Sequence, residues 1–114
     1  LLNNGVLDSV RYLDSSTVAT FNHRYFQDEN IRRALGFDKP LISSVSSHCS
    51  KYCSSESFGH SGFTGTLIWV EPENNTVFVF LSNRVYPNAS PNRLATSNIR
   101  TKIQDLIYKS LEIK

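Results

Sequence analysis

Hydrophobic residues gather in a few stretches of the chain, and the clearest of these predict an antiparallel hairpin. Residues 66–70 are rich in β-branched and aromatic side chains, and residues 76–81 form a continuous apolar run. Pro72 and Asn74-Asn75 supply turn residues between the two runs. The continuous apolar character of the second run predicts burial on both faces. The aromatic residues of this hairpin are expected to pack in the core; they are Trp69, Phe78 and Phe80.

The closing segment, residues 93–112, predicts an amphipathic helix. Its apolar positions recur at helical spacing, and we expect them to pack on one face of the sheet. They are Ile99, Ile103, Leu106, Ile107 and Leu111. The charged residues on the other face are interpreted as a solvated surface. A helix packed on an antiparallel sheet defines an α+β fold class.

The N-terminal half predicts smaller elements. Residues 6–13 favour a short hairpin or an extended link, and a helix capped by Ser15 or Ser16 is expected to run to about Tyr25. The pattern over residues 31–38 predicts a strand.

A serine-rich segment separates these elements from the hairpin. Residues 43–57 contain eight serines and almost no apolar residues, which predicts a long surface loop. The loop contains Cys49 and Cys53, with His48 beside them. A zinc site lacks a second ligand pair at suitable spacing, so a local disulfide or two free thiols are the preferred interpretations.

Composition limits the class of protein. A chain of 114 residues with 39% hydrophobic residues supports one modest core, and we interpret residues 1–114 as a single partial domain. The net charge of +2 comes from dispersed basic residues, which argues against a nucleic-acid binder. No apolar run approaches the roughly 20 residues of a membrane span. The chain contains no Met, and residues 1–5 resemble the end of a helix, so we expect a piece of a longer protein.

One stretch of the sequence resembles a known protein family. The triplet His60-Ser61-Gly62 begins residues 60–66, and the apolar hairpin and residues 81–88 follow it. This order resembles the C-terminal part of the serine β-lactamase and penicillin-binding-protein superfamily, with the class C β-lactamase-like hydrolases and esterases as the most similar branch. Residues 33–38 also resemble a strand of these proteins. The resemblance implies a part of the β-lactamase/transpeptidase-like fold.

The resemblance implies roles for four consecutive residues, 60–63, which begin with the triplet. His60 stands where the family usually has Lys, and a protonated or donor imidazole there would steer an anionic substrate or assist proton transfer. Ser61 would hydrogen-bond the substrate, and Gly62 would let it lie close to the strand. The backbone N–H of Phe63 would be one of two oxyanion-hole donors. The alternative readings are a structural strand-edge histidine and turn chemistry at the serine and glycine.

The resemblance also implies that two further residues contact the substrate. Asn88 matches the position that helps hold a substrate carboxylate in class C enzymes, and Arg93 matches a nearby arginine. The resemblance implies β-lactam, ester or peptidoglycan-peptide-like substrates, no cofactor, and a periplasmic or other extracytoplasmic location. The expected partner is the remainder of the same polypeptide, and an isolated piece is expected to self-associate.

The sequence also departs from the family. The nucleophile of these enzymes sits in Ser-x-x-Lys, yet the residues three before the five lysines are Gly36, His48, Ile99, Leu106 and Leu111. A serine nucleophile needs a base within hydrogen-bond reach, so this chain alone is expected to be inactive. The sequence therefore predicts part of a serine hydrolase whose nucleophile lies elsewhere. The alternative is a non-catalytic lactamase-like binding module joined to another enzyme, such as a cell-wall glycosidase.

Overall fold

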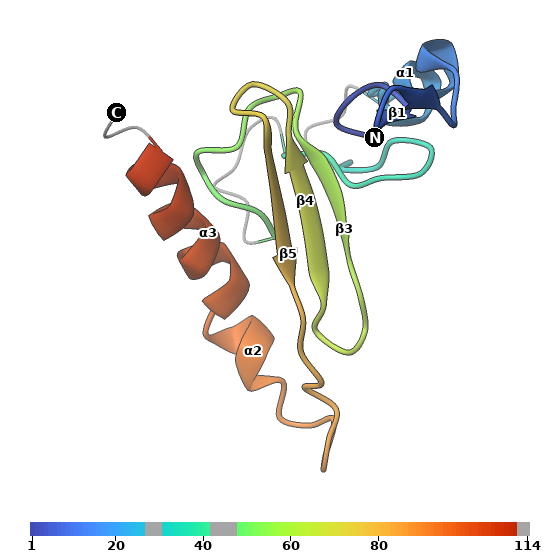
Figure 1. Ribbon diagram of the computed structural model, residues 1–114. Coiled ribbons are helices and arrows are strands. Elements are labelled where there is room, and N and C mark those ends of the chain that lie inside the picture. The colour runs from blue at the N-terminus through green and yellow to red at the C-terminus, as the bar shows by residue number, and fades with distance from the viewer. Residues whose placement is uncertain (27–30, 42–47, 112–114) are drawn as a thin grey trace.

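Residues 1–26, 31–41 and 48–111 are described by a computed structural model (Figure 1). Their elements follow the order β1 (Val6–Leu7), β2 (Val10–Arg11), α1 (Ser15–Asn22), β3 (Phe58–Ser61), β4 (Leu67–Glu71), β5 (Thr76–Phe80), α2 (Arg93–Thr96) and α3 (Ile99–Leu111). The first two strands form a two-stranded sheet, and the next three form an antiparallel sheet in the order β3-β4-β5. Helix α3 runs beside the larger sheet, while β1, β2 and α1 gather near one end of it (Figure 1). The predicted α+β class is confirmed.

The central hairpin forms where the sequence predicts it. Strands β4 and β5 pair with Trp69 opposite Phe78, and the turn between them places Asn75 at a φ of 50°. Asn tolerates this left-handed conformation better than most residues. Trp69 is 1% exposed and packs with Leu67 and Cys49 in the core, where Cys53, Phe78 and Phe80 also contact them.

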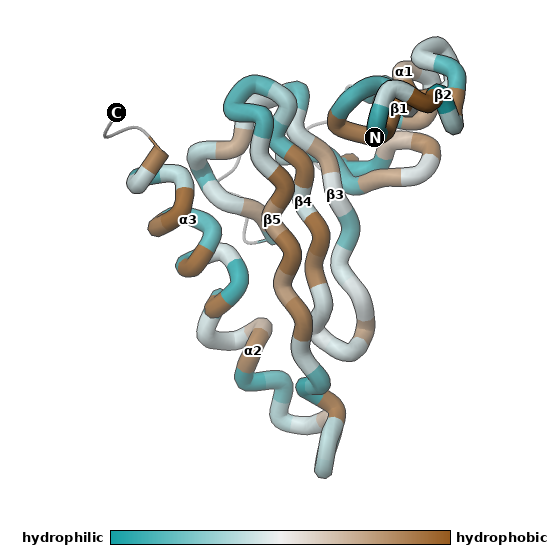
Figure 2. The backbone as a smooth tube through the Cα atoms, in the orientation of Figure 1, coloured by the Kyte–Doolittle hydropathy of each residue, from teal (hydrophilic) through white to brown (hydrophobic). Residues whose placement is uncertain are grey.

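The expectation that β5 is buried on both faces is wrong for the described residues. Phe78 and Phe80 face the core, but Val77 and Val79 on the other face are 46% and 54% exposed. Figure 2 shows hydrophobic residues along both β4 and β5. One apolar face of the sheet therefore meets solvent in this chain.

The N-terminal elements agree with the sequence in type. Residues 6–13 contain the predicted short hairpin. Helix α1 begins at Ser15, is preceded by Asp14 as the N-cap residue, and ends at Asn22 rather than near Tyr25.

The strand predicted over residues 31–38 is wrong. The N–H of Ala34 donates to the carbonyl of Phe37 over 2.9 Å, so the segment folds back on itself in a tight turn. Arg33 then faces Asp38 of the same segment, and Asp38 also bridges to Gly59 of β3. The segment therefore forms a local turn in place of the extended strand that its alternating apolar and polar residues predict.

Residues 48–57, the described part of the predicted surface loop, contain no helix or strand, as expected, but they do not lie wholly at the surface. Residues 42–47 lie outside the described ranges, but Cys49, Ser50 and Ser57 are buried. Their polar groups find partners: the N–H of Ser50 donates to Oε1 of Gln104 over 2.9 Å, and the hydroxyl of Ser57 donates to the carbonyl of Ser54 over 2.8 Å. Satisfied polar groups allow a serine-rich segment without regular structure to be buried.

The C-terminal helical region is interrupted. A break between α2 and α3 contains Asn98 at a φ of 50°, so the predicted single helix becomes two.

The packing face of α3 also differs from the prediction. Its fully buried residues are Gln104 and Tyr108, whereas Ile99, Ile103 and Leu106 are 38%, 36% and 66% exposed. Ile107 and Leu111 are half-buried.

A buried carboxylate explains which face of α3 packs inward. Glu71 at the end of β4 is 2% exposed. Oε2 of Glu71 accepts hydrogen bonds from the Tyr108 hydroxyl over 2.9 Å and from the N–H of Ser54 over 2.8 Å. A buried charge must be hydrogen-bonded, so the polar side of α3 turns toward it and the apolar stripe turns away. Burial also raises the pKa of Tyr108, which keeps its hydroxyl protonated as a donor.

Candidate active site

The candidate site residues lie at the open edge of β3. On its other edge β3 pairs with β4, and the N–H of Gly62 extends this pairing by donating to the carbonyl of Thr66 over 2.8 Å. Backbone groups of successive residues alternate sides in an antiparallel strand, so those of Ser61 point to the same edge as those of Gly59, and Phe63 begins the turn that follows. Within the described ranges, no backbone hydrogen bond reaches Ser61 at this edge or the N–H of Phe63. This edge can therefore pair with an extended ligand.

The turn after β3 requires glycine at two positions. A Cβ atom at Gly62 would lie 2.3 Å from Oγ1 of Thr66. Gly65 has a φ of +94°, and a Cβ there would lie 2.5 Å from Oγ of Ser82. Turn chemistry therefore accounts for both glycines.

Asp38 closes the same edge just upstream. Asp38 and Gly59 exchange two backbone hydrogen bonds of 2.7 and 3.0 Å. The side chain of Asp38 is 3% exposed, and its Oδ1 lies 3.3 Å from Nε of Arg32 and 2.6 Å from Nη1 of Arg33. One buried negative charge thus holds two guanidinium groups beside β3.

His60 is exposed on β3 and contacts one of these arginines. Nη1 of Arg33 lies 3.1 Å from Nε2 of His60. A guanidinium has donors only, so Nε2 must accept and the ring proton must sit on Nδ1. This geometry favours a neutral donor imidazole over the protonated form that the sequence leaves open.

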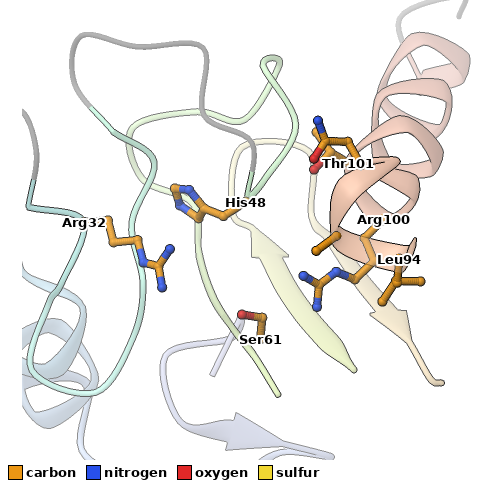
Figure 3. Close-up of a pocket in the computed structure, with 8 residues that line it drawn as sticks. Arg32, His48, Ser61, Leu94, Arg100 and Thr101 are labelled. Atoms are coloured by element: carbon orange, nitrogen blue, oxygen red, sulfur yellow. The ribbon is translucent and has the colours of Figure 1, made fainter. Parts of the chain in front are cut away.

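Ser61 lines a cavity of about 160 Å³ between β3 and the start of α3 (Figure 3). Arg32 and His48 lie on one side of Ser61, and Leu94, Arg100 and Thr101 lie on the other (Figure 3). The cavity is lined by Arg32, His48, Ser61, Leu94, Ala95, Asn98, Arg100 and Thr101. Two guanidinium groups and the serine hydroxyl give this cavity the donors needed for an anionic ligand.

His48 joins this cavity to the core. Nε2 of His48 lies 3.1 Å from the carbonyl of Lys39, to which it donates, and the ring centroid lies 5.7 Å from that of Trp69. Burial lowers the pKa of His48, so the ring is neutral at physiological pH.

Arg100 holds the turn that follows β3. Its Nη1 donates to the carbonyls of Gly65 and Thr66 over 3.1 and 3.2 Å. Burial lowers the pKa of Arg100, with Arg84 adding repulsion, but an arginine remains charged well above neutral pH. Helix α3 thereby fixes the position of the turn.

Phe63 exposes its side chain while its backbone lies in the turn. The ring is 75% exposed, and Cζ of Arg84 lies 4.6 Å from its centroid. The N–H of Arg84 also donates to the carbonyl of Thr64 over 2.9 Å. The segment after β5 thus also holds the turn in place.

Asn88 and Arg93 share a second hollow. They line a volume of about 480 Å³ that is separate from the cavity beside Ser61, although Leu94 lines both. Both side chains are exposed. The described structure therefore brings these two residues to each other and to the neighbourhood of the triplet, but not into contact with it.

Lys39 is the buried lysine of the described chain, and its surroundings do not resemble a nucleophile–base pair. Nζ donates to Oδ1 of Asn22 over 3.2 Å and to the carbonyl of Glu56 over 3.1 Å. Burial lowers the pKa of Lys39 to about 8.

Cys49 and Cys53 carry thiol groups and form no disulfide bond with each other in the structure. Cys49 is fully buried, and a hydrogen bond from its thiol lowers the pKa of Cys53. Within the described ranges no group of His, Cys, Asp or Glu is arranged to hold a metal ion.

Sequence reasoning missed Arg33, Asp38 and Arg100 as neighbours of the triplet. Their contacts cross from a turn and from a helix to β3, and spacing along the chain does not reveal such contacts. The one available signal was the pair of adjacent arginines at 32–33 shortly before Asp38, because opposite charges so near in sequence can form ion pairs.

None of the helices within the described ranges is long and apolar enough to cross a membrane.

Comparison with known proteins identifies the family. A family model described as Beta-lactamase matches residues 3–101. Putative D-alanyl-D-alanine carboxypeptidases from Salmonella typhi and Salmonella paratyphi B are each 31% identical to the chain over 121 residues. These alignments cover 98% of the chain and 28% of each relative, so the chain spans little more than a quarter of their length.

The match extends from the N-terminal hairpin through β3 to the start of α3. It includes the triplet and the two residues that hold the turn after β3, Arg84 and Arg100. The resemblance stated on residues 60–66 and 81–88 is confirmed. The chain belongs to the β-lactamase family.

Proposed function

We propose that residues 1–114 form the C-terminal part of a single serine hydrolase domain that transfers acyl groups from an amide, an ester or a cell-wall peptide. The observation that carries this proposal is the open edge of β3 at Ser61, followed by the turn that contains Phe63, which Arg100 holds, and bordered by cationic side chains. Such an edge binds an extended substrate through its backbone and leaves an N–H free to stabilise an oxyanion.

Each residue of the triplet strand has a role in this proposal. The N–H of Phe63 donates to the oxyanion, and the Ser61 hydroxyl binds the substrate from the adjoining cavity. Gly62 keeps the strand accessible, since it adds no side chain beside the turn. His60 donates from Nδ1, because its Nε2 accepts from Arg33. Asn88 and Arg93 bind a more distant polar group of the substrate.

The remainder of the polypeptide is proposed to supply the nucleophile. None of the five lysines of this chain follows a serine in Ser-x-x-Lys, and Tyr86-Pro87-Asn88 comes after the triplet rather than before it. The curated relatives are named D-alanyl-D-alanine carboxypeptidases and are more than three times as long as the matched part. We place the enzyme outside the cytoplasm of a bacterium, where such substrates occur, and require no metal or organic cofactor.

The absence of Ser-x-x-Lys from this chain also favours a second candidate function. A family member without a nucleophile elsewhere in its polypeptide would be a non-catalytic module that binds cell-wall peptides at the edge of β3. Reading the upstream gene for Ser-x-x-Lys and a later Tyr-x-Asn separates the two candidates.

Acylation by a fluorescent β-lactam tests the proposal directly. We expect the full-length protein to form a one-to-one covalent adduct on an upstream serine, and the 114-residue chain to form none, because the chain lacks the nucleophile–base pair. Intact-mass measurement on both proteins provides the readout. A stoichiometric adduct on the isolated chain would show that its own serines are reactive. A full-length protein without an adduct and without Ser-x-x-Lys would favour the binding module.

The exposed apolar surfaces support a contact with the rest of the polypeptide. One lies on the outer face of the sheet, where Ile68 is 44% exposed beside Val77 and Val79, and the other is the stripe of Ile103 and Leu106 on α3. Native domains usually cover such surfaces. We propose that upstream residues cover them, and that the isolated chain self-associates through them.

Light scattering of the isolated chain tests this self-association. We expect its apparent mass to rise with concentration, and the variant Leu106→Glu to weaken that rise with little change in melting temperature, since this side chain is 66% exposed. Lys102→Glu, at an exposed polar position of the same helix, is the control and should retain the association. A concentration-independent monomer would contradict the expectation.

A further inference from the structure

The two cysteines of the chain meet in the core, although neither has a part in the proposed acyl transfer. Cys49 is fully buried with Leu67 and Trp69, and Cys53 packs against the same cluster. The N–H of Cys53 donates to the carbonyl of Ser50 over 3.2 Å, so a tight turn brings residue 53 back toward residue 49. The thiol of Cys49 donates a hydrogen bond to Cys53. The two sulfur atoms are therefore in contact, as a disulfide between them requires.

Cys53 is the thiol of this pair that a reagent in solution can reach. It is half-buried and lies at a hollow of about 240 Å³. The hollow is lined by Arg24, Pro40, Leu41, Cys53 and Ser55. Cys49 has no exposed surface and does not line this hollow. A small reagent therefore meets Cys53 first, while Cys49 stays in contact with Cys53 from the core.

The surroundings of Cys53 favour its thiolate, which is the attacking form in disulfide exchange. The hydrogen bond from Cys49 is the main cause that lowers the pKa of Cys53. Nε2 of Gln104 also donates to Sγ of Cys53 over 3.6 Å. Burial and the carboxylate of Glu71 act in the opposite direction without cancelling this effect. Cys53 thus combines access from solvent with a reactive sulfur.

We propose that Cys53 and Cys49 form a redox-reactive dithiol, in which Cys53 attacks a small disulfide from solution and Cys49 resolves the product. In the first step the Cys53 thiolate bonds to one sulfur of oxidised glutathione, whose S–S bond breaks and releases one glutathione thiolate. In the second step the Cys49 thiolate bonds to Sγ of Cys53, and the mixed disulfide breaks to release the second. The cysteine pair loses two electrons, and the two glutathione thiols that form take up the two electrons and the two cysteine protons.

This dithiol lies apart from the open edge of β3, and its chemistry does not depend on acyl transfer. The pair joins three parts of the fold, because Cys49 packs on Trp69 of β4 and Gln104 of α3 contacts Cys53. A disulfide there ties residues 49–53 into a closed ring beneath α3. We expect the disulfide to persist in an oxidising compartment and the dithiol in a reducing one.

Peptide mapping of the full-length protein tests the disulfide. Lys51 lies between the two cysteines, so trypsin, which does not cut before Pro40, places them on separate peptides, residues 34–51 and 52–84. After treatment of the native protein with oxidised glutathione and alkylation of the remaining thiols, we expect these peptides to stay joined until a reductant separates them. The joined species should lack the mass of two hydrogen atoms, and the intact mass should remain that of one chain. Peptides recovered separately would overturn the proposal.

Two variants of the full-length protein separate the two steps. Cys49→Ala is expected to retain glutathione on Cys53 as a mixed disulfide, because the resolving thiol is absent. Cys53→Ala is expected to acquire no glutathione on Cys49, because that thiol is fully buried. Glutathione on Cys49 in the second variant, or its absence from Cys53 in the first, would contradict the proposed order of attack.

Alkylation of the unsubstituted protein keeps the test independent of how the variants fold. The reduced, native full-length protein is treated briefly with iodoacetamide, and the label is measured on the same two tryptic peptides. We expect Cys53 to react at least roughly tenfold faster than Cys49, because access and thiolate character both favour it. Equal rates, or faster labelling of Cys49, would refute the assignment of Cys53 as the attacking thiol.

Discussion

Trp69→Ala is expected to lower the free energy of unfolding by about 3–5 kcal/mol, the usual cost of truncating a buried aromatic side chain. Trp69 is 1% exposed and lies at the centre of the cluster formed with Cys49 and Leu67. Its indole N–H has no hydrogen-bond partner among the described residues, so packing dominates its contribution there. The cost reflects lost contacts and the cavity left behind. Urea unfolding monitored by circular dichroism measures it.

Two leucines provide a matched control for this result. Leu67 is 3% exposed in the same cluster, whereas Leu81 just after β5 is 79% exposed. Leu67→Ala should cost about 2–5 kcal/mol, and Leu81→Ala no more than about 0.5 kcal/mol. Equal losses at the two leucines would mean that the core does not lie between the sheet and α3. The stability prediction for Trp69 would then fail with it.

His60→Ala in the full-length protein is expected to lower kcat by roughly 10²–10³, which corresponds to about 2.7–4 kcal/mol of barrier, with little change in melting temperature. The ring is exposed, so its removal opens no cavity. It does remove the Nδ1 donor and the acceptor that orients Arg33. A donor aimed at developing charge acts mainly on the transition state. Turnover and thermal unfolding should be measured on the same preparation.

The choice of control for His60 depends on the structure. Cys49→Ser would serve if residues 43–57 formed a surface loop, but Cys49 is fully buried and a serine there would bury an extra hydroxyl. His23→Ala is a better control, since His23 is exposed directly after α1 and does not line the cavity beside Ser61. Normal turnover in His60→Ala, or a large fall in its melting temperature, would indicate a structural histidine instead.

Local chemistry allowed much of the fold to be predicted. The β-branched and aromatic runs on either side of Pro72 and Asn75 contain strands β4 and β5, because alternation and turn residues act over a few positions. The triplet and its glycines located the turn after β3 for the same reason. The resemblance carried by these residues led to the β-lactamase family, which the match over residues 3–101 confirms.

Local chemistry did not predict which surfaces pack together. The apolar stripe of α3 has the correct spacing for a helix, yet its buried residues are Gln104, which contacts Ser50, and Tyr108, which contacts Glu71 of β4. The position of Glu71 decides this outcome, because a buried carboxylate gains more from the Tyr108 hydroxyl than from an isoleucine. The periodicity of a helix identifies an apolar face but not the partner that will cover it.

The sequence by itself determined the family, the hairpin, the core position of Trp69 and the residues of the triplet, since each depends on residue type and short spacing. Only the tertiary structure decided that Asp38 pairs with Gly59, that Arg33 meets His60, and that Arg100 holds the turn at Gly65. These contacts join residues far apart in the chain and depend on where a turn or a helix places a long side chain. Their directional hydrogen bonds and buried charge fix the electrostatics of the site, which composition and periodicity do not encode.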